Sequence, residues 1–306
     1  MERGAIPPGD LAGPFDLQST LESGQTYLWT RADGAMFEDD VAHGGSAWYE
    51  TVVPPLDGVG NSRAVVRVRQ VDGRLEWEST TDAVPLLTHL LRLDDDLTAV
   101  RAACPDLPLV QRSFDAYPGM RLVRDPPFGA LVSFICSAQM RVARIHGMQV
   151  SLAEAFGDRV TAGSRTYHAY PTPDALAAAT ETDLRELSLG YRAPYVRRTA
   201  EMVAEDEADP AAARELPYEE ARDYLTRFVG VGEKVADCVL LFSLGFLHAV
   251  PLDTWIQTAI ADHFPDCERG SYAETSRAIR ERLGGAYAGY AQTYLFYALR
   301  TGRIGE

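Results

Sequence analysis

The stretch that decides the fold is EEARDYLTRFVGVGEKVADCVLLFSLGF, residues 219–246. The pattern indicates a helix, a tight turn over the residues VGVG, and a second helix. Gly230 and Gly232 permit unusual backbone angles in this turn and leave its amides unobstructed. Such amides, together with the positive end of the following helix, suit an anion such as a phosphate group. A plain corner between two helices would also need glycines, so both interpretations stay open at this point.

Lys234 lies two residues after Gly232, in the first turn of the second helix. It is the only lysine among 29 basic residues, and all the others are arginine. A primary amine can lose its proton and form an imine, whereas a guanidinium does neither. The helix N-terminus and the apolar run that follows disfavour the charged form of the amine. Lys234 is therefore a candidate nucleophile, with chance survival of one lysine as the alternative.

Asp253 follows in AVPLDTWIQTAIADHF, after a proline-containing extended stretch and before a helical pattern. One role that the local sequence supports is that of an ordinary helix N-cap. The other is a carboxylate that points into a cleft. The two roles are compatible, because a capping carboxylate is held rigidly.

The remaining pattern predicts an α+β fold. Residues from about 13 to 80 carry strand signals in runs such as AWYETVV (47–53) and SRAVVRVRQV (62–71), which are separated by turns. From about residue 82 the apolar residues recur with a helical period. We expect a small N-terminal antiparallel β-sheet domain over residues 1–80. A mostly helical, two-lobed body over residues 81–306 follows, with a helix–hairpin–helix at about 219–245.

Composition sets further limits. The net charge of −15 argues by itself against a nucleic-acid partner, because phosphate binding normally uses an excess of Lys and Arg. An acidic surface with almost no lysine is typical of salt-adapted proteins, and we take salt adaptation as a hypothesis. The four cysteines lie far apart and show no spacing for zinc, an iron–sulfur cluster or a disulfide framework. With no secretory signal and no membrane span, we expect an intracellular protein in the cytoplasm, nucleoid or nucleus.

Several strings along the chain, in this order, resemble the 8-oxoguanine DNA glycosylases of the helix–hairpin–helix DNA glycosylase superfamily. Their order is more specific than any single motif, and they spread across nearly the whole chain. The strings are SGQTYLW (23–29), FGALVSFICSAQMRVARIHGM (128–148), LSLGYRAPYV (187–196), FVGVGEKVADCVLLFSLGFLHAVPLD (228–253) and AYAGYAQTYLF (286–296).

The resemblance implies a chemistry for Lys234 and Asp253. Lys234 would attack C1′ of the damaged nucleotide, expel the base and form a Schiff base, after which β-elimination nicks the strand. Asp253 would stabilise positive charge on the sugar and help to ready the amine. The resemblance implies no cofactor and no catalytic metal. The expected partner is double-stranded DNA containing 8-oxoguanine, and we expect a monomer with no membrane association.

The resemblance also assigns four residues to the damaged base, which must leave the stack to be reached. The backbone carbonyl of Gly24 would accept the hydrogen that oxidised guanine carries on N7, where normal guanine presents a lone pair. Phe296 would stack on the base, Gln292 would bond its pairing edge, and Cys238 would pack against its other face. Without the resemblance, a Phe or Cys on an apolar helix is usually a core residue.

Arg144, Tyr191 and Arg192 match residues that fill the gap in the duplex and bind the orphaned cytosine, while Gly230 and Gly232 belong to the DNA-binding hairpin. The chain departs from its relatives at two positions. Gln139 stands where close relatives have an Asn-rich stretch, so Gln139 would be the plug and a strict preference for cytosine is in doubt. Trp255 replaces a His that contacts a phosphate, which puts phosphate binding and rate in doubt.

Two alternatives remain from the sequence. The first is a monofunctional glycosylase for alkylated bases, which shares the hairpin and the Asp but uses an activated water; Lys234 argues against it. The second is a helix–hairpin–helix DNA-binding protein without catalysis. The joint presence of the Lys, the Asp and the base-contact positions argues against that alternative.

Overall fold

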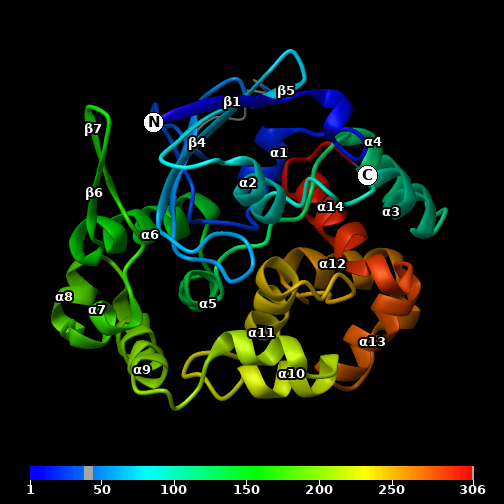
Figure 1. Ribbon diagram of the computed structural model, residues 1–306. Coiled ribbons are helices and arrows are strands. Elements are labelled where there is room, and N and C mark those ends of the chain that lie inside the picture. Colours follow the sequence, from blue (N-terminus) through cyan, green and yellow to red (C-terminus); the bar gives the residue numbers. More distant parts are fainter. Residues whose placement is uncertain (38–43, 305–306) are drawn as a thin grey trace.

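A five-stranded antiparallel sheet forms the N-terminal part of the chain (Figure 1). The structure is a computed structural model, and it describes residues 1–37 and 44–304. The sheet has the strand order β1-β5-β4-β3-β2. Its strands are β1 (Glu2–Ile6), β2 (Thr30–Arg31), β3 (Tyr49–Val53), β4 (Ala64–Val71) and β5 (Arg74–Ser79).

The expected sheet is confirmed, with differences in detail. The runs AWYETVV and SRAVVRVRQV supply β3 and β4, but the first strand begins at Glu2, before the expected start. A short helix, α1 (Leu17–Glu22), also interrupts the strands. It forms because Asp16 caps it, accepting a hydrogen bond from the amide of Ser19 at 2.6 Å. Local capping therefore overrides the strand signal here.

Thirteen further helices follow the sheet, as the helical period predicts, in the part of the chain that the structure describes. They are α2 (Val84–Leu90), α3 (Leu97–Ala103), α4 (Pro108–Ala116), α5 (Pro127–Cys136), α6 (Val142–Phe156), α7 (Pro173–Ala178), α8 (Glu181–Glu186), α9 (Ala193–Ala204), α10 (Tyr218–Leu225), α11 (Glu233–Val239), α12 (Thr254–His263), α13 (Tyr272–Arg282) and α14 (Ala288–Arg300). A small hairpin of β6 (Arg159–Ala162) and β7 (Arg165–His168) lies among them and was not expected from the sequence.

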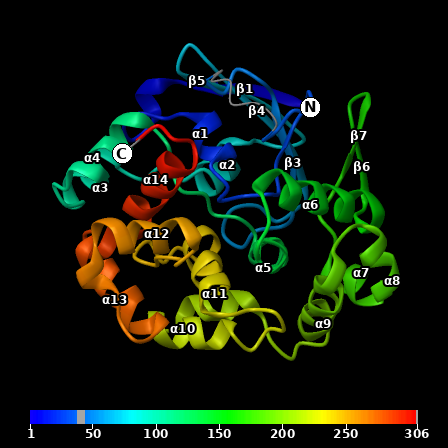
Figure 2. The ribbon, with the colours of Figure 1, turned by 180° about the vertical axis from the view of Figure 1, so that it is seen from behind.

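Most of the later helices form two lobes that lie below the sheet in Figures 1 and 2. In both views, α7, α8 and α9 lie on one side, and α10, α12 and α13 lie on the other (Figures 1 and 2). Between them, α5 packs against α11, the second helix of the hairpin. A π-helical turn, Leu240–Leu244, extends α11 and continues its apolar face. Among the described residues, no helix is both long and apolar enough to cross a bilayer.

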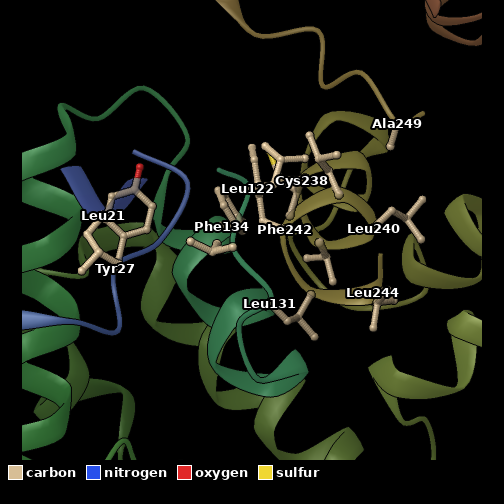
Figure 3. Packing of buried hydrophobic residues seen from close by; sticks show 14 of the residues in the cluster. Leu21, Tyr27, Leu122, Leu131, Phe134, Cys238, Leu240, Phe242, Leu244 and Ala249 are labelled. Atoms are coloured by element: carbon tan, nitrogen blue, oxygen red, sulfur yellow. The ribbon is translucent and has the colours of Figure 1, made fainter. Parts of the chain in front are cut away.

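One hydrophobic core joins the sheet to the two lobes. Figure 3 shows Tyr27 from the N-terminal part beside Phe134 of α5 and Phe242 after α11. The rings of Tyr27 and Phe134 meet edge to face at 5.9 Å, and those of Phe134 and Phe242 stack at 5.7 Å. Segments that are distant in sequence are thereby fixed to one another. The division into two domains at about residue 80 stays a prediction.

Asp125 lies in this junction, just before α5, and is almost completely buried. Its amide donates to the carbonyl of Phe242 at 2.8 Å. Burial raises the pKa of its carboxyl from an ordinary value of 3.8 to about 7, against the lowering effect of a hydrogen bond with Thr26. The folded state therefore holds the proton to a higher pH than the unfolded chain does.

We expect the free energy of unfolding of the wild type to fall, relative to Asp125→Asn, as the pH rises from about 4 to about 7. The reason is that the buried carboxyl loses its proton in this window, whereas the amide has none to lose. Denaturant unfolding of both proteins across the window measures the difference. A difference that stays constant with pH would contradict the assignment to Asp125.

Candidate active site

A cavity of about 760 Å³ lies where the loop after α1, the end of α5, α11, the start of α12 and α14 meet. Its size is within the range of small-molecule sites, roughly 300 to 1,000 Å³. Eight of the residues singled out from the sequence line it: Gly24, Gln139, Lys234, Cys238, Asp253, Trp255, Gln292 and Phe296. A second cavity, of about 420 Å³ beside β3 and β7, is lined by none of them.

Lys234 stands in the first turn of α11 and is half-buried. Its Nζ donates to Oγ of Ser137 at 3.1 Å, and that hydroxyl in turn donates to the carbonyl of Phe134 at 2.7 Å. Within the described ranges, no carboxylate lies close enough to Lys234 to form an ion pair. The amine is therefore held at the cavity wall by a neutral hydroxyl. Ser137 is the C-cap of α5 and lies in the segment FGALVSFICSAQMRVARIHGM, residues 128–148. No sequence signal distinguishes it from an ordinary serine.

Asp253 combines the two roles that the sequence left open. Its Oδ1 caps α12 by accepting from the amide of Ile256 at 2.9 Å, and the residue also lines the cavity. Burial raises the pKa of this carboxyl above its ordinary range. The amide of Ile256 and the positive charge of Lys234 oppose that rise. The hydrogen bond thus fixes the direction of the carboxylate. The surroundings offset only part of the cost of burying its negative charge.

A hydrogen-bond chain connects the helix of Lys234 to the loop of Asp253. The amide of Leu252 donates to the hydroxyl of Tyr272 at 3.1 Å, and this hydroxyl donates to Asp237 at 2.8 Å. Asp237 lies in α11 and accepts a second bond from Tyr218 at 2.7 Å. Because Leu252 directly precedes Asp253, the chain fixes the position of the carboxylate relative to α11.

Gly24 is placed by its neighbour Gln25, which is fully buried. The side-chain amide of Gln25 donates to the carbonyls of Thr20 and Arg121 at 3.0 and 2.7 Å, and its oxygen accepts from the amide of Val123 at 2.9 Å. Gly24 itself has φ +94°, in the region that favours glycine. The loop therefore brings to the cavity a backbone segment that carries no side chain of its own at Gly24.

Cys238, Gln292 and Phe296 line the cavity from two helices. Gln292 and Phe296 lie one turn apart on α14, as the sequence predicts, and Cys238 lies one turn beyond Lys234 on α11. Burial raises the pKa of the Cys238 thiol to about 12, so the thiol is neutral near pH 7. The group therefore offers an apolar surface rather than a second nucleophile.

Arg144, Tyr191 and Arg192 do not line the cavity. Arg144 and Tyr191 are exposed, but Arg192 is buried. Its guanidinium donates to the carbonyl of Ala138 and packs over the ring of Tyr191, with 4.3 Å between its central carbon and the ring centre. In this conformation Arg192 supports the turn that presents Gln139, whose φ of +55° is unusual for a residue with a side chain. Its binding to an orphaned base stays a prediction.

The hairpin glycines differ from each other. Gly230 has φ +84°, and a Cβ there would lie 2.8 Å from the ring of Tyr195. Gly232 has φ −96° and ψ 178°, which other residues also adopt, so the backbone freedom of glycine is used at Gly230 and not at Gly232. Gly232 instead occupies the N-cap of α11, and open space surrounds the position where its Cβ would be. Both glycines lie outside the residues that line the cavity.

Comparison with known proteins gives consistent matches. A family described as HhH-GPD superfamily base excision DNA repair protein matches residues 132–284. A probable N-glycosylase/DNA lyase of Methanothermobacter thermautotrophicus is 31% identical, over 98% of this chain and 97% of the relative. MBOgg1 in complex with a low affinity DNA ligand superimposes with a TM-score of 0.82 at 26% identity, covering 99% of this chain and 100% of that one.

A second solved structure is similar over a comparable length. It is the Clostridium acetobutylicum 8-oxoguanine glycosylase/lyase in complex with double-stranded DNA that contains cytosine opposite 8-oxoguanine. The TM-score is 0.80 at 28% identity, and the match covers 95% of this chain and 94% of that one. Both the sheet and the helical body are therefore shared with this structure.

We expect Tyr272→Phe to loosen the loop that carries Asp253. The substitution removes the acceptor of the Leu252 amide and one donor to Asp237, and leaving such buried groups unsatisfied costs about 1–3 kcal/mol of unfolding free energy. Amide hydrogen exchange should become faster at Leu252 and unchanged in α14. Tyr287→Phe is the matched control, because the Tyr287 hydroxyl has no hydrogen bond among the described residues. Unchanged exchange at Leu252 would show that the chain does not hold the loop.

Proposed function

The chain belongs to the HhH-GPD superfamily of base excision DNA repair proteins, and we propose that it is an N-glycosylase/DNA lyase that removes 8-oxoguanine from double-stranded DNA. The observation that supports this most directly is that the only lysine amine of the chain and a fixed carboxylate line one cavity of suitable size for a purine. A full-length relative with the name N-glycosylase/DNA lyase supports the reaction type.

The reaction begins at Lys234. The lone pair of its Nζ attacks C1′ of the damaged nucleotide, the bond from C1′ to the base breaks, and the electron pair of that bond leaves with the base. Loss of the amine protons and opening of the sugar then give the Schiff base, from which β-elimination breaks the strand on the 3′ side. Ser137 contributes by accepting a hydrogen bond from the amine, which aims the lone pair of the nitrogen.

Asp253 supports this step electrostatically. Its carboxylate is destabilised by burial, so it gains when positive charge develops on the sugar beside it. The amide of Ile256 keeps the carboxylate from rotating away. The same group is available to take a proton as the amine becomes bonded to carbon.

Recognition of the base falls to four other residues that line the cavity. The carbonyl of Gly24 accepts the N7 hydrogen of 8-oxoguanine and repels the N7 lone pair of guanine. Phe296 and Cys238 contact the two faces of the base, and Gln292 bonds its pairing edge. All four line the cavity, and the neutral thiol of Cys238 suits an apolar contact.

The undamaged side of the duplex meets a different set of residues. Gln139 enters the gap, with Arg144, Tyr191 and Arg192 near the orphaned base, and the turn of Gly230 and Gly232 contacts the backbone. Arg192 must leave its bond to Ala138 before it can bind a base.

Two other functions are less well supported. A monofunctional glycosylase would use a water in place of the amine, but Lys234 occupies the cavity wall where that water would act. A DNA-binding protein without catalysis gives no reason for a carboxylate whose pKa is raised by burial at the same cavity.

We expect Lys234→Gln to abolish both strand cleavage and covalent trapping by borohydride on a duplex with 8-oxoguanine, while DNA binding survives. Lys234→Arg is the matched control, because it keeps the positive charge but cannot form an imine. Trapping that persists in Lys234→Gln would move the nucleophile to another amine.

We expect Asp253→Asn to slow base release by about 10² to 10³ under single-turnover conditions, since the charge opposite the sugar is lost. The amide oxygen of Asn still caps α12, so the free energy of unfolding should change little. A rate close to that of the wild type would reduce Asp253 to a helix cap.

A further inference from the structure

Arg300 is a cavity residue that the assignments above do not use. It lies one turn after Phe296 on α14, and its guanidinium packs over two rings, 5.4 Å from the ring centre of Phe296 and 5.0 Å from that of Tyr297. Its Nη2 donates to the carbonyl of Glu22 at 3.0 Å. The side chain therefore reaches from α14 to the loop that carries Gly24.

The other nitrogen of this guanidinium, Nη1, is buried and has no hydrogen-bond partner. Nη1 lies close to Gly24, and a Cβ added to that glycine would be 2.7 Å from this nitrogen. In the described part of the chain, Arg300 forms no ion pair. Arginine keeps its proton in proteins, and a largely buried charge with no ion pair is unfavourable to folding. Such a charge is expected where it serves a site.

The position of this charge relative to the cavity indicates what it serves. Arg300 contacts Gly24 and Phe296, the two residues to which we assign contacts with the damaged base. Burial lowers the pKa of the guanidinium, and the nearby Asp253 and the hydroxyls of Tyr297 and Tyr27 oppose this effect. Arg300 is thus a cation placed on the base side of the cavity, opposite in charge to Asp253.

We propose that Arg300 stabilises the negative charge that the base carries away when its bond to the sugar breaks, an inference that rests on the proposed function. As the C1′–N9 bond breaks, its electron pair stays on N9 and spreads over the imidazole ring and the oxygen at C8. A fixed cation behind that ring lowers the energy of the developing anion in a site that excludes water. Asp253 favours the positive sugar and Arg300 favours the negative base, so the two charges act on opposite fragments.

The test compares two reactions of the same enzyme. Release of 8-oxoguanine needs a leaving base, whereas nicking at a preformed abasic site does not. We expect Arg300→Met to slow base release by about 10² or more and to leave abasic-site nicking unchanged. The remaining base release should rise steeply as the pH falls, because the base must then leave with a proton. Arg300→Lys should recover part of the rate, since it restores the charge.

The matched control is Arg303→Met, which removes an exposed arginine just after the same helix. Equal losses of base release and abasic-site nicking in Arg300→Met would show a purely structural role and overturn the proposal, as would no loss at all. A wild-type enzyme that releases no 8-oxoguanine would refute the proposed function, and this inference with it. If the wild type releases 8-oxoguanine and Arg300→Met releases it at the same rate, the proposed function stands and only the role of Arg300 is refuted.

Discussion

The whole site depends on holding a half-buried primary amine at the wall of a cavity without pairing it directly with a carboxylate. Lys234 meets this constraint through the hydroxyl of Ser137, which orients the nitrogen and carries no charge. Asp253 is close enough to interact electrostatically with the amine, but its hydrogen bond goes to the amide of Ile256. A direct salt bridge would favour the protonated amine, which lacks the lone pair that the reaction needs. In this structure Ser137 therefore orients the amine, while Asp253 supplies the negative charge of the site.

Several hydrogen-bond bridges keep this arrangement in place. Tyr272 and Asp237 fix the loop before Asp253 to α11, and Gln25 fixes the loop of Gly24 to the segment before α5. The apolar contacts of Phe134 with Tyr27 and Phe242 add a second link between the N-terminal part, α5 and the end of α11. Because these groups are buried, each lost bond leaves an unsatisfied partner, and the geometry is correspondingly well defined.

The sequence identified the residues whose chemistry is unusual, and it could not identify those whose role comes from placement. Lys234 was visible because it is the only lysine, and Asp253 because a carboxylate precedes a helix. Ser137 and Arg300 belong to residue types that are usually unremarkable, and only tertiary contacts bring them to the cavity. Arg192 was assigned to the orphaned base from the resemblance, and its burial against the turn of Ala138 could not be read from the sequence. In the fold, α1 was missed because its N-cap overrode the strand pattern of the surrounding sequence. The β6–β7 hairpin was missed because short-range strand pairing overrode the helical pattern around it.

The most direct measurement is the mass of the peptide that carries the sugar remnant after borohydride reduction of the complex with a duplex containing 8-oxoguanine. The account predicts a single adduct on the peptide that contains Lys234, because no other lysine exists in the sequence. An adduct on the terminal amino group, or base release with no adduct on any peptide, would contradict it.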